Sequence, residues 1–210
     1  LGFEKLVYDG LAKVFTGIIV APIGGMMFGI AATGLIIYFF ARRKPAIVNR
    51  TFGRLQIISS AWFALTHGAN DGQKTMGIIV LILFSVGLIE ELEMPLWVIF
   101  AAAGAMGLGT FFGGYKVIKT LGVKVTRLKP YQGFAAETSG GIMLAVFATL
   151  GIPASTTHAI TGTIMGAGSA RRIRAVRWKV SRQIIFSWVI TIPGAAGLGA
   201  LGTYIINLFL

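Results

Sequence analysis

Long apolar stretches alternate with short polar segments along the chain. Four of these stretches reach the length of about 20 apolar residues that a helix needs to cross a bilayer: residues 14–41, 55–88, 95–115 and 184–210. The second stretch is interrupted by a run of polar side chains at residues 67–75. The pattern predicts an all-α integral membrane protein with about four membrane-crossing helices, one of them broken.

Residues 133–170 follow a different pattern. Their two apolar arms, residues 134–150 and 159–170, are each shorter than the roughly 20 residues of a full span. Between the arms stands Gly151-Ile-Pro-Ala-Ser-Thr-Thr-His158, where Pro153 cannot lie inside a helix without removing a hydrogen bond. We expect a re-entrant helical hairpin with its polar tip at membrane depth. Two complete spans joined by an external turn are the alternative.

Composition and charge support a membrane protein and orient it. Apolar residues make up 55% of the 210 residues and charged residues 12%, whereas a soluble domain has roughly 25% charged residues. The net charge of +12 is concentrated at residues 42–54, 116–129 and 171–182, with acidic side chains at 90–93. The positive-inside rule makes the basic loops cytoplasmic. We therefore expect a multi-pass protein of the cell (inner or plasma) membrane, and we exclude a soluble enzyme and a nucleic-acid-binding domain.

The chain divides into four segments on this basis. They are residues 1–54 (first span and basic loop), 55–130 (broken span, third span and loop), 131–182 (hairpin and basic connector) and 183–210 (last span). The connector at residues 169–182 mixes basic and apolar side chains and should contact membrane lipids. The opening, Leu1-Gly-Phe-Glu-Lys5, has no initiator Met, so we expect the chain to begin inside a longer sequence.

The polar run in the second span contains the first group of candidate site residues. Asn70 and Asp71 offer oxygen ligands that suit a small cation such as Na+, and Gly68 and Gly72 permit an unwound backbone beside them. Charged side chains at the bilayer centre are tolerated when they pair, bind ions or face a cavity. Further candidates in this run are His67 for proton coupling and Gln73, Lys74 and Thr75 for substrate binding. The alternative is a simple pairing of Asp71 with Lys74.

The second group lies where the second hairpin arm should begin. Ser155, Thr156 and Thr157 can cap that helix, and a helix N-terminus with free N–H groups attracts anions. His158, like His67, is either a proton-coupling group or a satisfied interior histidine. Glu137, near the start of the first arm, is either a coupling-ion site or an interfacial residue paired with Arg127 or Lys129. An anion site beside a cation site is the chemistry of an ion-coupled anion symporter.

Two of these motifs resemble signatures of the inorganic phosphate transporter (PiT) family. Residues 67–77, His-Gly-Ala-Asn-Asp-Gly-Gln-Lys-Thr-Met-Gly, are similar to its Gly-Ala-Asn-Asp signature, and residues 151–162 are similar to its Ser-Thr-Thr-His signature. Residues 133–137 and 177–193 also look like neighbouring segments of the family. The family carries each signature twice, in inverted repeats, and this chain carries each once. The chain therefore resembles the C-terminal half of such a transporter, and residues 2–24 resemble the stretch after the first repeat.

The resemblance implies symport of inorganic phosphate with Na+ or H+ by alternating access, completed by an N-terminal half. According to the matching family motifs, Asn70 and Asp71 would hold the coupling ion and phosphate. The hydroxyls of residues 155–157 would hold phosphate oxygens, and Glu137 would be the acidic position before the hairpin. Gln73, Lys74 and Thr75 depart from the small apolar run of many members. Lys74 could attract phosphate itself or replace one cation.

Other functions stay open at this point. A permease for sulfate or another tetrahedral oxyanion has the same requirements, and a passive anion channel needs no coupling ion. An intramembrane hydrolase could use Ser155, His158 and Asp71, but the spacing of Ser155 and His158 is more typical of helix capping, so we expect no enzymatic activity. We expect no cofactor beyond the coupling ion, and a homodimer remains open.

Overall fold

The described chain, residues 7–209 of the computed structural model, folds into helices and short loops. Within that range no strand occurs, which confirms the all-α prediction. The expectations for residues 1–6 and for residue 210 lie outside it. The elements are α1 (Tyr8–Phe40), α2 (Pro45–Ser85), α3 (Leu96–Lys119), the π-helical turn η2 (Thr120–Val125), α4 (Pro130–Thr149), α5 (Thr156–Ser169), the 3-10 turn η3 (Ile173–Ala175) and α6 (Trp178–Phe209).

Three helices in the described range are long and apolar enough to cross a membrane: Tyr8–Phe40, Leu96–Val125 and Trp178–Leu208. They correspond to the predicted first, third and last spans. The most apolar window of α6 has 0% of its residues buried. Such a surface needs lipid or another protein against it.

The prediction of a broken second span is wrong. Residues Pro45–Ser85 form one α-helix of 41 residues, and Gly68 and Gly72 both lie inside it. Polar side chains did not require an unwound backbone here, because His67, Asp71 and Lys74 recur at helical spacing and bond to one another.

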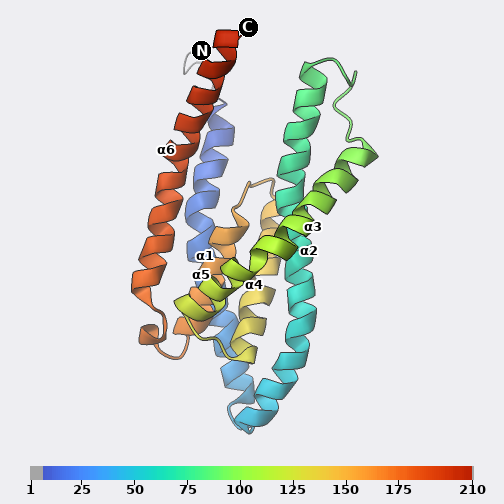
Figure 1. Cartoon of the computed structure of the whole chain (residues 1–210). Coiled ribbons are helices and arrows are strands. Elements are labelled where there is room, and N and C mark those ends of the chain that lie inside the picture. Colours follow the sequence, from blue (N-terminus) through green and yellow to red (C-terminus); the bar gives the residue numbers. More distant parts are fainter. Residues whose placement is uncertain (1–6, 210) are drawn as a thin grey trace.

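The hairpin formed by α4, residues 150–155 and α5 lies between α1 and α2, while α3 crosses these helices obliquely (Figure 1). The α4 helix ends in a Schellman motif: the Ile152 N–H donates to the Phe147 carbonyl at 2.9 Å and the Gly151 N–H to that of Ala148 at 3.2 Å. Gly151 takes the positive φ of 62° that this ending requires. Pro153 then prevents the helix from continuing. The sequence-based prediction of a helical break at this place is confirmed.

A seam of small residues joins α1 to α5. The buried residues of α1 recur every four positions, at Gly17, Ala21, Gly25, Gly29 and Thr33. A Cβ atom on Gly25 would stand 2.7 Å from the carbonyl oxygen of Ala159, and one on Gly29 would collide with the backbone of Thr163. Backbones packed this closely are typical of membrane helices, whose association depends on van der Waals contact.

The first hairpin arm presents glycines to α2 instead. The side chains of Phe63 and Trp62 on α2 fill the space that Gly140 and Gly141 leave open: a Cβ on Gly140 would stand 3.0 Å from the Phe63 ring, and one on Gly141 would overlap the Trp62 ring. The hairpin is therefore held on both sides, by α1 through α5 and by α2 through α4.

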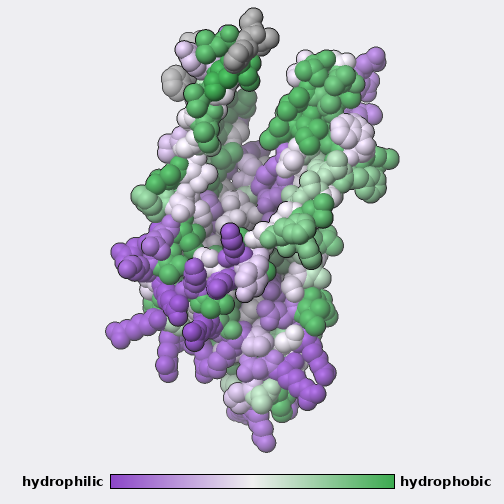
Figure 2. All heavy atoms as spheres, viewed as in Figure 1, coloured by the Kyte–Doolittle hydropathy of each residue, from purple (hydrophilic) through white to green (hydrophobic). Residues whose placement is uncertain are grey.

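Hydrophilic residues gather at the end of the molecule opposite the start of α1 and the end of α6 (Figure 2). The loops that connect α1 to α2, η2 to α4 and α5 to α6 all lie at that end and contain basic side chains. The three basic clusters predicted to share one side of a membrane therefore share one end of the fold.

Candidate functional site

Asp71 is the centre of a polar cluster that joins α2 to the hairpin. One carboxylate oxygen, Oδ2, accepts a hydrogen bond of 2.8 Å from the Thr156 hydroxyl and lies 3.0 Å from His67 Nε2. The other, Oδ1, accepts a hydrogen bond of 3.2 Å from Lys74 Nζ. The two polar motifs of the sequence, 85 residues apart, thus come into direct contact.

Lys74 makes a second contact in the same cluster. Its ammonium group donates to the carbonyl oxygen of Ala154, in the hairpin loop, at 2.6 Å. The predicted pairing of Asp71 with Lys74 is present. It extends beyond the helix, because the same ammonium group also holds the hairpin.

Asn70 lies one residue from Asp71 and points toward α4. Its side chain is buried, and Nδ2 donates to the carbonyl oxygens of Thr66 at 3.2 Å and of Leu144 at 3.3 Å. The amide nitrogen therefore joins α2 to α4. What Asn70 can offer to a ligand is its amide oxygen.

Gln73 and Thr75 are exposed on α2. Within residues 7–209, Gln73 forms no hydrogen bond with the Asp71 cluster. Gln73 lies two positions after Asp71, and positions i and i+2 of a continuous helix do not face each other. Thr75 lies on the same face as Asp71, and its hydroxyl donates to the Asp71 backbone carbonyl at 3.3 Å. The roles predicted for these two residues remain predictions.

The hydroxyl residues of the hairpin tip have three different environments. Ser155 caps α5, and its Oγ accepts the N–H of His158 at 3.4 Å. Thr156 is buried and bonds to Asp71, whereas Thr157 is exposed. The first N–H groups of α5 lack carbonyl partners one turn back, so this helix end attracts negative charge. The Asp71 carboxylate already lies against it.

His158 packs against the last long helix of the described chain. Its ring stacks on that of Trp188 in α6, with centroids 3.8 Å apart, and its buried Nδ1 has no hydrogen-bond partner among the described residues. His158 therefore joins α5 to α6, and both interpretations of this residue remain predictions.

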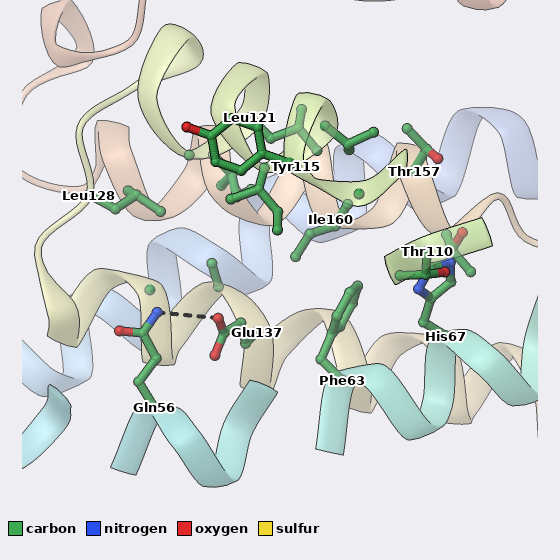
Figure 3. Close-up of a pocket in the computed structure, with 18 of the residues that line it drawn as sticks. Gln56, Phe63, His67, Thr110, Tyr115, Leu121, Leu128, Glu137, Thr157 and Ile160 are labelled. Carbon is green, nitrogen blue, oxygen red and sulfur yellow. Dashed lines mark hydrogen bonds between the residues drawn. The ribbon is translucent and has the colours of Figure 1, made fainter. Parts of the chain in front are cut away.

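Glu137 forms a second polar cluster, with two α2 residues that the sequence analysis missed. Its carboxylate accepts hydrogen bonds from Ser59 Oγ at 2.6 Å and from Gln56 Nε2 at 3.2 Å (Figure 3). Among residues 7–209 no ion pair includes Glu137, so the predicted pairing with Arg127 or Lys129 is absent. Ser59 precedes Asp71 by about 18 Å along α2, at about 1.5 Å per residue. Glu137 and Asp71 therefore do not share one ion site.

An open cavity of about 1080 Å³ connects the two clusters. It lies between α3 with η2 on one side and α2, α4 and α5 on the other. Gln56 and Glu137 line one end, His67 and Thr157 line the other, and Phe63 lies between them (Figure 3). A small solute in this cavity would meet Gln56 and Glu137 at one end and His67 and Thr156, which both contact Asp71, at the other.

Fold and site together define a class of protein. A helical chain with several apolar helices of membrane-crossing length, and with charged side chains held between its helices, is a polytopic membrane protein. A model described as the phosphate transporter family matches residues 1–199. The chain belongs to the phosphate transporter family, which confirms the family resemblance.

Curated relatives match nearly the whole chain. A "probable low-affinity inorganic phosphate transporter" of Rhizobium meliloti is 45% identical over 201 residues, which are 95% of this chain and 60% of that protein. One of the same name from Bacillus subtilis is 38% identical over 99% of this chain and 62% of its own length. The chain thus spans about 60% of the length of these relatives. The relatives are transporters, not enzymes, in agreement with the prediction.

A solved structure has the same fold. The protein described as "the sodium-dependent phosphate transporter" superposes with a TM-score of 0.82 at 23% identity, over 100% of this chain and 70% of that chain. At this identity the match establishes the fold.

Proposed function

We propose that the protein to which this chain belongs carries inorganic phosphate across the membrane together with a cation, Na+ or H+. The hydrogen bond of 2.8 Å between Thr156 and Asp71 carries the proposal. It joins a helix N-terminus, which attracts anions, to a carboxylate, which attracts cations, in a chain of the phosphate transporter family. Each ion lowers the charge of the other while both cross together.

The roles divide between the two sides of this contact. Phosphate oxygens are held by the hydroxyls of Ser155 and Thr157 and by the free N–H groups of the first turn of α5. Asp71, with the amide oxygen of Asn70 beside it, is one position whose oxygens attract positive charge. Glu137, whose hydrogen-bond donors are neutral, is a second cation position at the other end of the cavity. The remaining part of the transporter completes both sites.

The hairpin enters the membrane and returns to the same side. The α5 helix has 14 residues and is about 21 Å long, less than the hydrocarbon core of about 30 Å. Both ends of the hairpin lie at the basic end of the fold, which is the cytoplasmic end by the positive-inside rule. Its tip meets α1 at Gly17 and α2 at Asp71, several turns before either helix ends. In this arrangement α2 is the fourth crossing helix.

The names of the relatives support phosphate as the substrate, and the structural neighbour, described as sodium-dependent, supports coupling to a cation. A hairpin tip at membrane depth is suited to alternating access, because a site there can open to either side of the membrane in turn.

The direct test is uptake of radioactive phosphate by the full-length protein in proteoliposomes. Asp71→Asn and Thr156→Ala should each reduce uptake at least about tenfold, since a hydrogen bond to a charged group contributes about 1.5–3 kcal/mol. Thr203→Ala is the matched control, because its hydroxyl bonds only within exposed α6.

Three results would contradict the proposal. Normal uptake in both variants would reject the site. Uptake that sulfate inhibits as strongly as unlabelled phosphate does would point to a general oxyanion permease. Flux that is independent of every cation gradient would point to a channel.

A further inference from the structure

Lys74 lies on an exposed turn of α2, yet its ammonium group is held by specific contacts. Its ammonium group lies between two oxygens from different elements, the carbonyl of Ala154 at 2.6 Å and Oδ1 of Asp71 at 3.2 Å. The Lys74 side chain is 43% exposed, so water could solvate it instead. An ion pair this exposed contributes little to stability.

The two oxygens form part of a ligand set for a small cation. A carboxylate together with a backbone carbonyl, at an interruption between two helices, is a combination with which transporters bind Na+. The lysine ammonium group is a compact positive charge with three donors and no acceptor. It therefore satisfies the same oxygens that a metal ion would.

The remaining oxygen of Asp71 is also engaged. Its Oδ2 accepts from Thr156 at 2.8 Å and lies 3.0 Å from His67 Nε2. A mobile cation between α2 and the hairpin tip would have to displace the ammonium group of Lys74, which is covalently attached to the same helix turn.

We propose that Lys74 is a tethered cation, which permanently occupies the space between Asp71 and Ala154 and replaces a mobile Na+ there. The inference rests on the proposed function and makes Lys74 the residue that determines the cation requirement of this half. The site then keeps Asp71 neutralised with or without Na+, so phosphate can approach the tip when Na+ is absent. The coupling ion of this half binds elsewhere, and Glu137 is the acidic group at the other end of the cavity.

The first measurement uses the purified full-length protein and does not depend on transport. A ligand that binds only the folded state raises the unfolding temperature. We compare thermal unfolding in NaCl and in choline chloride for the wild type, Lys74→Gln, Lys74→Met and Lys74→Arg. The two neutral variants should gain a Na+-specific stabilisation beyond that of the wild type, and Lys74→Arg, which keeps the charge, should not.

The second measurement is phosphate uptake in the same two salts. Replacing Na+ by choline should leave wild-type uptake within about twofold, whereas uptake by Lys74→Gln should fall about tenfold in choline and recover with Na+, a difference of about 1.4 kcal/mol. Lys119→Gln, an exposed lysine at the end of α3, is the matched control and should behave as the wild type.

Equal Na+ responses of wild type and Lys74→Gln in thermal unfolding would overturn the tethered-cation inference. A wild type that takes up no phosphate in either salt would overturn the proposed function instead. The unfolding comparison would then still decide the inference about Lys74.

Discussion

At the scale of single residues, the site depends on a few side chains that each connect two helices. Asp71 and Lys74 connect α2 to the hairpin tip, Asn70 connects α2 to α4, and Glu137 connects α4 to α2. Each connection has one carboxyl, ammonium or amide group and one neutral partner on another element. A substitution at such a residue should therefore change ligand binding and helix packing to different degrees, which matched variants can separate.

Thr156 is the residue for which the two effects separate most clearly. Thr156→Ser keeps the hydroxyl that donates to Asp71, and Thr156→Val keeps the shape without it. The valine variant should bind phosphate about 10- to 100-fold more weakly, the equivalent of about 1.5–3 kcal/mol for a hydrogen bond to a charged group, and the serine variant should remain close to wild type. Equilibrium binding of phosphate to the full-length protein measures this. Equal losses in both variants would show that shape and not the hydroxyl matters.

Glu137 should govern coupling and not the binding of phosphate. Glu137→Gln removes the charge and keeps an acceptor oxygen for Ser59. Exchange of phosphate for phosphate should persist, whereas uptake driven by a cation gradient should fall at least about tenfold, because a neutral amide lacks the charge that holds the ion. Tracer exchange and gradient-driven uptake in proteoliposomes are compared, with Glu91→Gln in the exposed α2–α3 loop as control. A variant that still couples fully would remove Glu137 from the mechanism.

At the scale of elements, the lengths of the apolar stretches predicted most helices, and Pro153 with Ser155 predicted the hairpin turn. Two features could not be read from local sequence in this way. The α2 helix continues through a polar run, and one of the partners that satisfy Asp71 there is Thr156, 85 residues away. The partners of Glu137 lie 78 and 81 residues before it.

A signal for both features was nevertheless present. Polar residues recur at helical spacing from Gln56 through Ser59 and His67 to Lys74, which is the pattern of one helix face. The four-residue spacing of Gly17, Ala21 and the small residues that follow likewise indicated the seam between α1 and α5.

The seam gives a prediction in which two glycines of the same helix respond with opposite sign. A Cβ at Gly29 would collide with the backbone of Thr163, whereas Gly34 has nothing within 4 Å of such an atom. Gly29→Ala should destabilise the protein by about 1–3 kcal/mol through overpacking, and Gly34→Ala should stabilise it by about 0.4–1 kcal/mol through the unfolded chain. Thermal unfolding in detergent compares them. Similar shifts in the two variants would argue against this packing.

At the scale of the whole molecule, the proposed orientation can be tested because the chain contains no cysteine. In a cysteine-free background of the full-length protein, Glu91→Cys and Arg172→Cys should react with a membrane-impermeant thiol reagent from opposite sides of the membrane. Arg43→Cys should react from the same side as Arg172→Cys, because both loops lie at the basic end. Labelling of whole cells and of inverted vesicles measures this. Reaction of all three from one side would refute the topology.

The glycine seam also limits how the protein can move. At the glycines of the seam, backbone atoms of α1 and α5 come so close that a Cβ atom would collide, so neither helix can slide by a fraction of a turn without a collision. Helices α1 and α5, with α4 and α2 attached through their own contacts, should therefore rock as one block. The most apolar windows of Leu96–Val125 and of α6 are 11% and 0% buried, against 22% for α1. In the alternating-access cycle proposed above, we therefore expect the gates at the borders of α3 and α6 with that block.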